Sequence, residues 1–203
     1  MNNAFRTALL VASSIMIVLG TVPYLVDIAK KKTKPRVISW FNWGILGAIA
    51  GAAALSDNQI PAAVLSFASV LEVMLVVILG LFYGDRHFEK LDLFCQVGAG
   101  IGLTLWFTLN SPLLAIIIIT IVDLIAAVPT YRHIWQAPKE ETLSTFVICA
   151  IASALTLASV ASLAPTGLIY PIYLLLANLF MASLIIIRTR AQAEAVRTPY
   201  KAS

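Results

Sequence analysis

Long apolar stretches separated by short polar segments dominate the chain. Charge-free runs extend over residues 7–26, 37–56, 93–122 and 142–187. Each run is at least as long as the roughly 20 apolar residues that an α-helix needs to cross a bilayer. Together with the proline and glycine breakers between them, these runs predict seven membrane-spanning helices. The predicted spans cover residues 6–28, 37–56, 60–83, 91–109, 112–134, 142–163 and 166–188.

The composition agrees with a membrane protein and excludes a soluble globular domain. Of the 203 residues, 60% are hydrophobic and 12% are charged, whereas about 25% of the residues in a typical soluble domain are charged. The mean hydropathy is +0.92. The two cysteines, Cys95 and Cys149, lie in apolar stretches and indicate neither a disulfide nor a metal site. We therefore expect an all-α integral membrane protein without a cofactor.

The positions of the charges predict an orientation. With seven spans, three of the connections and the C-terminal tail lie on one side of the membrane. That side holds every basic residue except Arg6: Lys30, Lys31, Lys32, Lys34, Arg36, Arg86, Lys90, Arg132, Lys139, Arg188, Arg190, Arg197 and Lys201. By the positive-inside rule, the N-terminus is outside and the C-terminus is cytoplasmic, in a plasma membrane that we expect to be the bacterial inner membrane. Basic residues placed in this way indicate membrane orientation and not a nucleic-acid partner.

Two stretches of the chain resemble each other. Pro23 is followed by a basic loop and by Ser39 at the start of the second span. Pro129 is followed by a polar loop and by Ser144 near the start of the sixth span. The prolines are 106 positions apart and the serines are 105 positions apart. Helices one and two therefore align with helices five and six.

The same offset places Glu72 of the third span opposite Asn178 of the seventh. The chain is then two copies of a three-helix unit, and the fourth helix lets both copies enter the membrane in the same direction. The predicted parts are a first repeat over residues 1–89, a linker helix over 90–110, a second repeat over 111–190 and a cytoplasmic tail over 191–203.

This 3+1+3 plan, with its matched prolines, Lys-rich loop and matched serines, resembles the PQ-loop and SWEET superfamily of seven-helix membrane transporters. The resemblance implies parallel repeats related by an axis along the membrane normal. The sequence departs from the family pattern where Tyr24 and Thr130 replace the glutamine that follows proline. It also lacks the tryptophan deep in the second helix of a repeat, so the resemblance does not imply a sugar substrate.

Two acids fall near the middle of predicted spans. Glu72 and Asp123 lie about halfway along the third and fifth spans, where a charged side chain costs roughly 2.5–3.5 kcal/mol on insertion scales. Intramembrane acids of this kind mark solute and proton pathways, and we expect both residues to bind solute and to couple transport to protons. The alternative is a protonated acid that stabilises helix packing through a hydrogen bond.

Further candidates for solute binding are Asn178, Asn42 and Trp43. The resemblance to SWEETs implies that Asn178, at mid-depth in the seventh span, binds substrate in the central pocket. Asn42 lies deeper in the second span than an interfacial residue needs to lie. Trp43 offers an aromatic wall. Asn178 has the alternative role of a hydrogen-bonding contact between helices.

Other residues suggest moving parts or contact surfaces. Pro23 and Pro129 are matched helix-breaking sites that we expect to act as hinges, or simply to end their helices. Tyr170 and Tyr173 are candidates for an extracellular gate, with interfacial anchoring as the alternative. The GxxxG spacing in the fourth span, residues 98–102, permits close helix packing within the chain or in a homo-oligomer.

Taken together, these features predict a carrier that moves a small polar solute by alternating access through a pocket at the bilayer midplane. A sugar-like, amino-acid-like or cationic metabolite fits this description, and a carrier of the nicotinamide-riboside type shares the 3+1+3 plan. The alternative is a seven-helix receptor or assembly protein that binds without transport. An enzyme is not expected, because the sequence contains no HExxH, GxSxG or similar catalytic motif.

Overall fold

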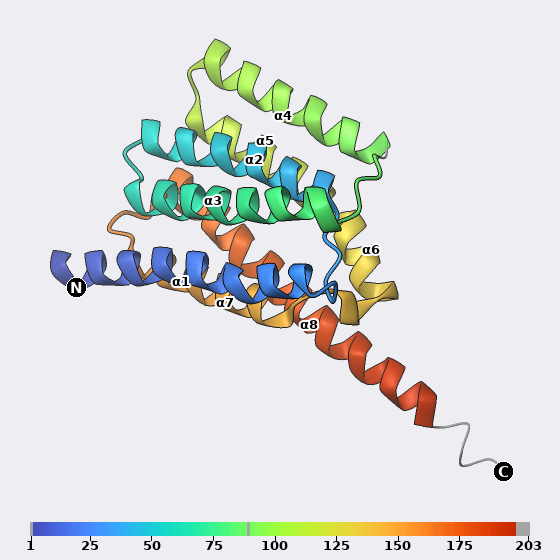
Figure 1. Cartoon of the computed structure of the whole chain (residues 1–203). Helices are drawn as coiled ribbons and strands as arrows, with labels where there is room; N and C mark the ends of the chain where they lie inside the picture. The colour runs from blue at the N-terminus through green and yellow to red at the C-terminus, as the bar shows by residue number, and fades with distance from the viewer. Residues whose placement is uncertain (1, 89, 198–203) are drawn as a thin grey trace.

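Helices account for nearly all of the regular structure in the computed structural model, which describes residues 2–88 and 90–197 (Figure 1). In chain order the elements are α1 (Asn3–Ala29), α2 (Val37–Ser56), α3 (Ile60–Tyr83), α4 (Lys90–Leu109), α5 (Pro112–Ala126), α6 (Val128–Gln136), the short 3-10 helix η1 (Pro138–Glu140), α7 (Leu143–Ser159) and α8 (Pro165–Arg197). These described residues form no β-strand.

Six helical segments are long and apolar enough to cross a membrane. They are α1, α2, α3, α4, the continuous segment formed by α5 and α6, and α8. The remaining apolar helix, α7, has 17 residues and is shorter than the others. The expectation of an all-α integral membrane protein is therefore confirmed.

Most of the predicted boundaries are close to those of the structure, and α2 and α3 match them residue for residue. The sixth span is shorter than predicted, because the chain turns extended at Val160. There the Arg6 guanidinium donates hydrogen bonds to the carbonyls of Ser159 and Val160, which satisfies backbone acceptors at the C-terminal end of α7. The last helix is longer than predicted: α8 continues to Arg197, into the predicted tail, and residues 198–203 lie outside the described residues.

Helices from the two halves of the chain are interleaved. In the first half, α3 packs against both α1 and α2, and in the second half α8 packs against both α7 and α5. Across the halves, α1 packs along α7, α2 along α5, and α3 contacts α8. The fourth helix, α4, lies at the edge of the bundle against α5 and α2 (Figure 1).

The two ends of the bundle differ in character. The connection between α1 and α2, the segment that follows α3, the α6–η1 region and the C-terminal part of α8 all lie at the right-hand end in Figure 1. We call this the basic end, because the lysine-rich loop at residues 30–36 is part of it. The N-terminus lies at the opposite end from the C-terminal part of α8 (Figure 1).

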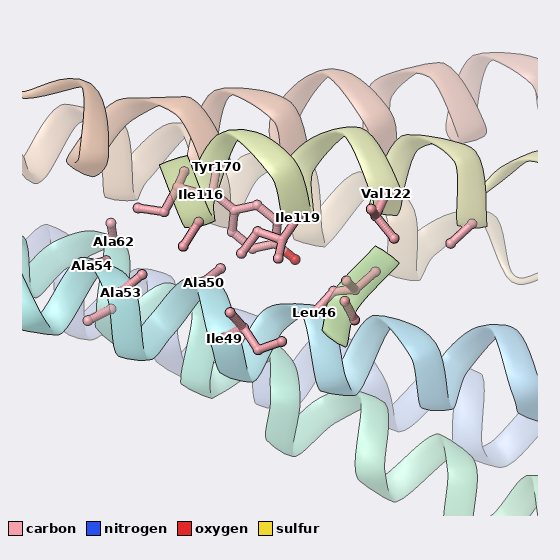
Figure 2. Packing of buried hydrophobic residues seen from close by; sticks show 14 of the residues in the cluster. Leu46, Ile49, Ala50, Ala53, Ala54, Ala62, Ile116, Ile119, Val122 and Tyr170 are labelled. Carbon is pink, nitrogen blue, oxygen red and sulfur yellow. The ribbon is translucent and has the colours of Figure 1, made fainter. Parts of the chain in front are cut away.

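The contact between α2 and α5 consists of small residues on one helix and branched residues on the other. Ala50, Ala53 and Ala54 of α2 face Ile116 and Ile119 of α5 in a fully buried cluster (Figure 2). Small side chains let two backbones approach closely, which is the main source of packing energy between helices in a membrane.

Glycine has the same role between α4 and α5. A Cβ atom built on Gly98 would lie 2.6 Å from Cγ2 of Val122, and one built on Gly102 would lie 3.3 Å from Cγ2 of Ile118. Gly100, between them, has no atom within 4 Å of such a position. The GxxxG spacing therefore packs α4 onto its own chain, so it is not evidence for a second copy.

Replacing Gly98 tests this contact. We expect Gly98→Ala to push α4 away from Val122 and to destabilise the protein by about 1–3 kcal/mol, as overpacking does. The matched control Gly100→Ala should be neutral or stabilising by up to about 1 kcal/mol, because alanine is the better helix former. Thermal unfolding of the purified protein in detergent measures both, and equal midpoints for the two variants would contradict the proposed packing.

Candidate functional site

A cavity of about 80 Å³ lies within the bundle and is lined by residues of α1, α2, α3, α5, α7 and α8. A single water needs about 10–15 Å³ by a comparable measure, so the cavity has room for several waters or a small solute. Glu72 of α3 and Asp123 of α5 both line it, with exposed fractions of 4% and 3%. The two intramembrane acids noted in the sequence therefore meet at one site.

Each acid accepts a hydrogen bond from a helix of the second half of the chain. The Tyr170 hydroxyl of α8 donates to Oδ2 of Asp123 at 2.9 Å. The Cys149 thiol of α7 donates to Glu72, with Sγ 3.4 Å from Oε1 and 3.5 Å from Oε2. These donors fix both carboxyl groups in position, and neither donor carries a positive charge.

Among the described residues that line the cavity there is no lysine, arginine or histidine. Aromatic rings form part of the walls, with Trp40 and Trp43 from α2 and Tyr170 and Tyr173 from α8. The Trp40 and Trp43 rings are 5.3 Å apart and approach edge to face, and the two tyrosine rings are 5.9 Å apart. Carboxyl groups and aromatic faces both attract cations, so the site is chemically suited to a positively charged group.

The amide of Asn178 also lines the cavity. Its Nδ2 donates to the carbonyl of Leu174, one turn earlier in α8, at 2.8 Å, which fixes the orientation of the amide. Glu72, Asp123, Asn178 and Trp43 thus lie around one space, as the sequence predicted.

Asn42 differs from the other predicted residues. It is 3% exposed and does not line the cavity. Successive residues of an α-helix are rotated by about 100°, so Trp40, Trp43 and Gly47 face the cavity while Asn42 points to the side. The direction of a side chain around the helix axis could not be predicted from the sequence.

The tyrosines proposed as an outer gate line the cavity itself. Tyr170 is buried and holds Asp123, and Tyr173 lies one turn further along α8. Both therefore contribute to the wall of the site beside its acid. Pro171, inside α8 between them, went unnoticed in the sequence.

The two matched prolines have different surroundings. Helix α1 continues through Pro23 to Ala29 without interruption. In the second half, α5 ends at Ala126 and α6 begins at Val128, immediately before Pro129. Proline has no N–H to donate, so it cannot complete the helix here. The helix is therefore irregular at Ala127, one turn beyond Asp123, although Ala127 keeps a right-handed helical backbone and its N–H still donates to the carbonyl of Asp123. We call this irregularity the break.

Sequence reasoning missed several residues of the cavity. Cys149, Trp40 and Thr145 line it, and so do Ser69, Ser153 and Phe146. A cysteine or a phenylalanine inside an apolar run is typical of ordinary packing, and only the rotation of each helix shows which side faces the interior. The hydroxyl groups of Thr145 and Ser153 donate to the backbone carbonyls of Gly20 and Cys149. Such bonds are common inside helical bundles, so these residue types did not indicate a cavity in the sequence.

A buried polar contact links α1 to the start of α7 at the basic end. The Tyr24 hydroxyl donates to Oε2 of Glu141 at 2.8 Å, and the Tyr24 ring lies 4.9 Å from that of Trp40, which lines the cavity. Next to this contact, the Thr142 hydroxyl donates to Oδ2 of Asp27 at 2.9 Å. At the other end, Thr166 of α8 donates to Asp57, which follows α2. Side-chain contacts therefore join the two halves of the chain at both ends of the bundle.

No protein-family model matches the chain, and no curated protein or solved structure gives a significant match. The interpretation of the site therefore depends on its own geometry and chemistry.

The Tyr24–Glu141 contact predicts a pH effect on stability. Burial raises the pKa of Glu141 from 4.5 to about 7, and the negative charge of Glu140 adds to the shift. A raised acid pKa favours the folded state while the group is protonated. This contribution, about 3 kcal/mol for such a shift, is complete below about pH 4.5 and is lost as the pH rises through about 7.

We therefore expect Glu141→Gln, which keeps an acceptor for Tyr24, to flatten the pH dependence of the thermal unfolding midpoint between pH 5 and pH 8. The control Glu140→Gln removes an exposed acid and should retain most of the slope. An unchanged slope in Glu141→Gln would rule out Glu141 as its source.

Proposed function

We propose that the protein is a membrane carrier that moves a small, positively charged solute by alternating access through the cavity that holds Glu72 and Asp123. The observation that carries this proposal is the pairing of two buried acids with aromatic walls and no basic residue in the described lining. A cavity of this kind favours a cation over an anion, and a cation over a neutral sugar.

The arrangement of helices supports two parallel repeats joined by α4. In the two repeats, α1 corresponds to α5 with α6, α2 corresponds to α7, and α3 corresponds to α8. Exchanging the repeats therefore converts the α1–α7 contact into the α5–α2 contact. It also converts the α3–α8 contact into itself. All three contacts occur in the bundle. This is the pattern expected of a two-fold axis along the membrane normal, as in the PQ-loop and SWEET superfamily that the sequence resembles.

Movement of one repeat against the other would then open the cavity to each side in turn. The cavity is enclosed by helices of both repeats, and Glu72 and Asn178 occupy matched positions in them. The break at Ala127 before Pro129 supplies a flexible point in the second repeat, and Pro23 supplies the matching position in the first.

The acids also support proton coupling. A carboxyl group that takes up a proton when the solute leaves, and releases it when the solute binds, exchanges one positive charge for another. Glu72 and Asp123 each have a neutral donor, Cys149 and Tyr170, and not a permanent cation. Both are therefore able to serve in this exchange. The basic end is proposed to be cytoplasmic, in a plasma membrane, with the N-terminus outside.

Ligand binding to the purified protein, followed by uptake into proteoliposomes, tests this proposal. We expect choline, ethanolamine or arginine, but not glucose, to raise the thermal unfolding midpoint of the purified protein, because a ligand that binds only the folded state stabilises it. The cation that stabilises should also be taken up. Binding without uptake would indicate a receptor, and stabilisation by glucose alone would contradict the cationic substrate class.

Substitution of the acids gives the corresponding test of the site. Glu72→Gln and Asp123→Asn should each lower cation uptake by about tenfold or more, because each removes a charge that binds the solute. Each should also weaken the response of uptake to pH. The control Glu194→Gln removes an exposed acid at the end of α8 and should leave uptake unchanged. Wild-type uptake with an unaltered pH response in both cavity variants would refute the roles assigned to these acids.

A further inference from the structure

Two buried polar side chains on α2 have no hydrogen-bond partner within the described part of the chain. They are Ser39, which is 1% exposed, and Asn42, which is 3% exposed. The unpaired atoms are Oγ of Ser39 and both Nδ2 and Oδ1 of Asn42. Because the two residues are three positions apart, they lie on the same face of the helix.

Such unpaired groups are unusual and destabilising. Burying a hydrogen-bonding group without a partner costs about 1–3 kcal/mol. Elsewhere in this bundle, buried hydroxyls are bonded: Ser13 donates to the carbonyl of Ala152, and Ser66 to that of Ala62, both at 2.9 Å. The amide of Asn42 has neither of its two polar atoms paired, and the packing of this conformation does not explain why it is buried.

The helix register places this pair beside the break in the fifth span. Leu46 and Ile49 lie on the same face of α2 and pack in the cluster with Ile119 and Val122 of α5 (Figure 2). The two helices run in opposite directions. One and two turns beyond Leu46, toward the basic end, Asn42 and Ser39 therefore lie opposite the last turn of α5 and the break at Ala127.

Beyond the break, the helices separate and a polar cleft opens at the basic end. Helix α6 packs on α8 and η1 but not along α2. The cleft has a volume of about 450 Å³, and its lining includes Lys34, Arg36, Asp85, Pro129, Arg132 and His133. On the other side of the break, Asp123 and Trp43 belong to the central cavity. Ser39 and Asn42 therefore lie between the cavity and the cleft.

We infer that Ser39 and Asn42 form the gate through which the solute passes between the central cavity and the cleft at the basic end. This inference rests on the proposed carrier function. In the conformation described here, both residues are buried and the gate is closed. Movement at the break before Pro129 uncovers them, and their amide and hydroxyl groups then hydrogen-bond to water and to the passing solute. The cleft, whose basic residues are accompanied by the acids Asp85 and Glu140, is the vestibule on that side.

Cysteine accessibility tests whether the gate opens. Ser39→Cys and Asn42→Cys should react with a membrane-impermeant maleimide applied to the basic-end side of sealed proteoliposomes, above the background of the native cysteines. The matched control is Leu46→Cys, on the same face one turn deeper and equally buried. Labelling of Asn42→Cys about tenfold faster than Leu46→Cys is expected for local opening. Equal, negligible labelling of all three would overturn the gate.

A second variant separates a role in transport from a role in folding. Asn42→Leu removes the unpaired amide and keeps a side chain of similar size, so it should raise the midpoint of thermal unfolding while lowering cation uptake. An amide retained for packing would give the reverse result, a lower midpoint. A lower midpoint, or a raised midpoint with wild-type uptake, would contradict the inference.

These results distinguish the gate from the carrier function on which it rests. Cation uptake by the wild type, without labelling at residues 39 and 42 and with normal uptake by Asn42→Leu, would leave the carrier and exclude this gate. Labelling at both positions in a protein that transports none of the cations would leave a moving gate and exclude the carrier.

Discussion

Two carboxyl groups lie inside the bundle of apolar helices, and no positively charged side chain among the described residues lines their cavity. Glu72 and Asp123 line one cavity, and their donors are the uncharged Cys149 and Tyr170. An acid at the bilayer centre costs roughly 2.5–3.5 kcal/mol on insertion scales, and a single neutral hydrogen bond offsets only part of that cost. A bound cation, as proposed for this site, would offset the rest of that cost.

The rest of the bundle is arranged around this site. Helices of both halves enclose it, and small residues between α2 and α5 and between α4 and α5 allow the close packing that holds its walls. Polar contacts join the halves at both ends: Tyr24 with Glu141 at the basic end, and Thr166 with Asp57 at the other. The basic end also has the break at Ala127 and, among the described residues, the unpaired amide of Asn42.

Much of the fold and part of the site could be predicted from the sequence. Hydrophobic runs and breakers located every long helix, and α2 and α3 to the residue, because length in the membrane is set by bilayer thickness, but the ends of α7 and α8 differ from the prediction. Depth along each helix then placed Glu72, Asp123 and Asn178 at one level. Rotation about each helix axis could not be predicted, because it depends on packing against neighbours. For that reason Cys149 and Trp40 were missed and Asn42 was assigned to the cavity.

The most direct test of a cation-selective cavity uses its own thiol, Cys149, as a reporter in the Cys95→Ala background. The rates of its reaction with trimethylammonium-ethyl and sulfonatoethyl methanethiosulfonate are measured relative to a small thiol in solution. We predict that Cys149 prefers the cationic reagent over the anionic one more strongly than the free thiol does. Choline should slow the reaction of Cys149 with the cationic reagent, and Glu72→Gln should reduce the preference. An equal preference for both reagents, or a preference for the anion, would contradict this prediction.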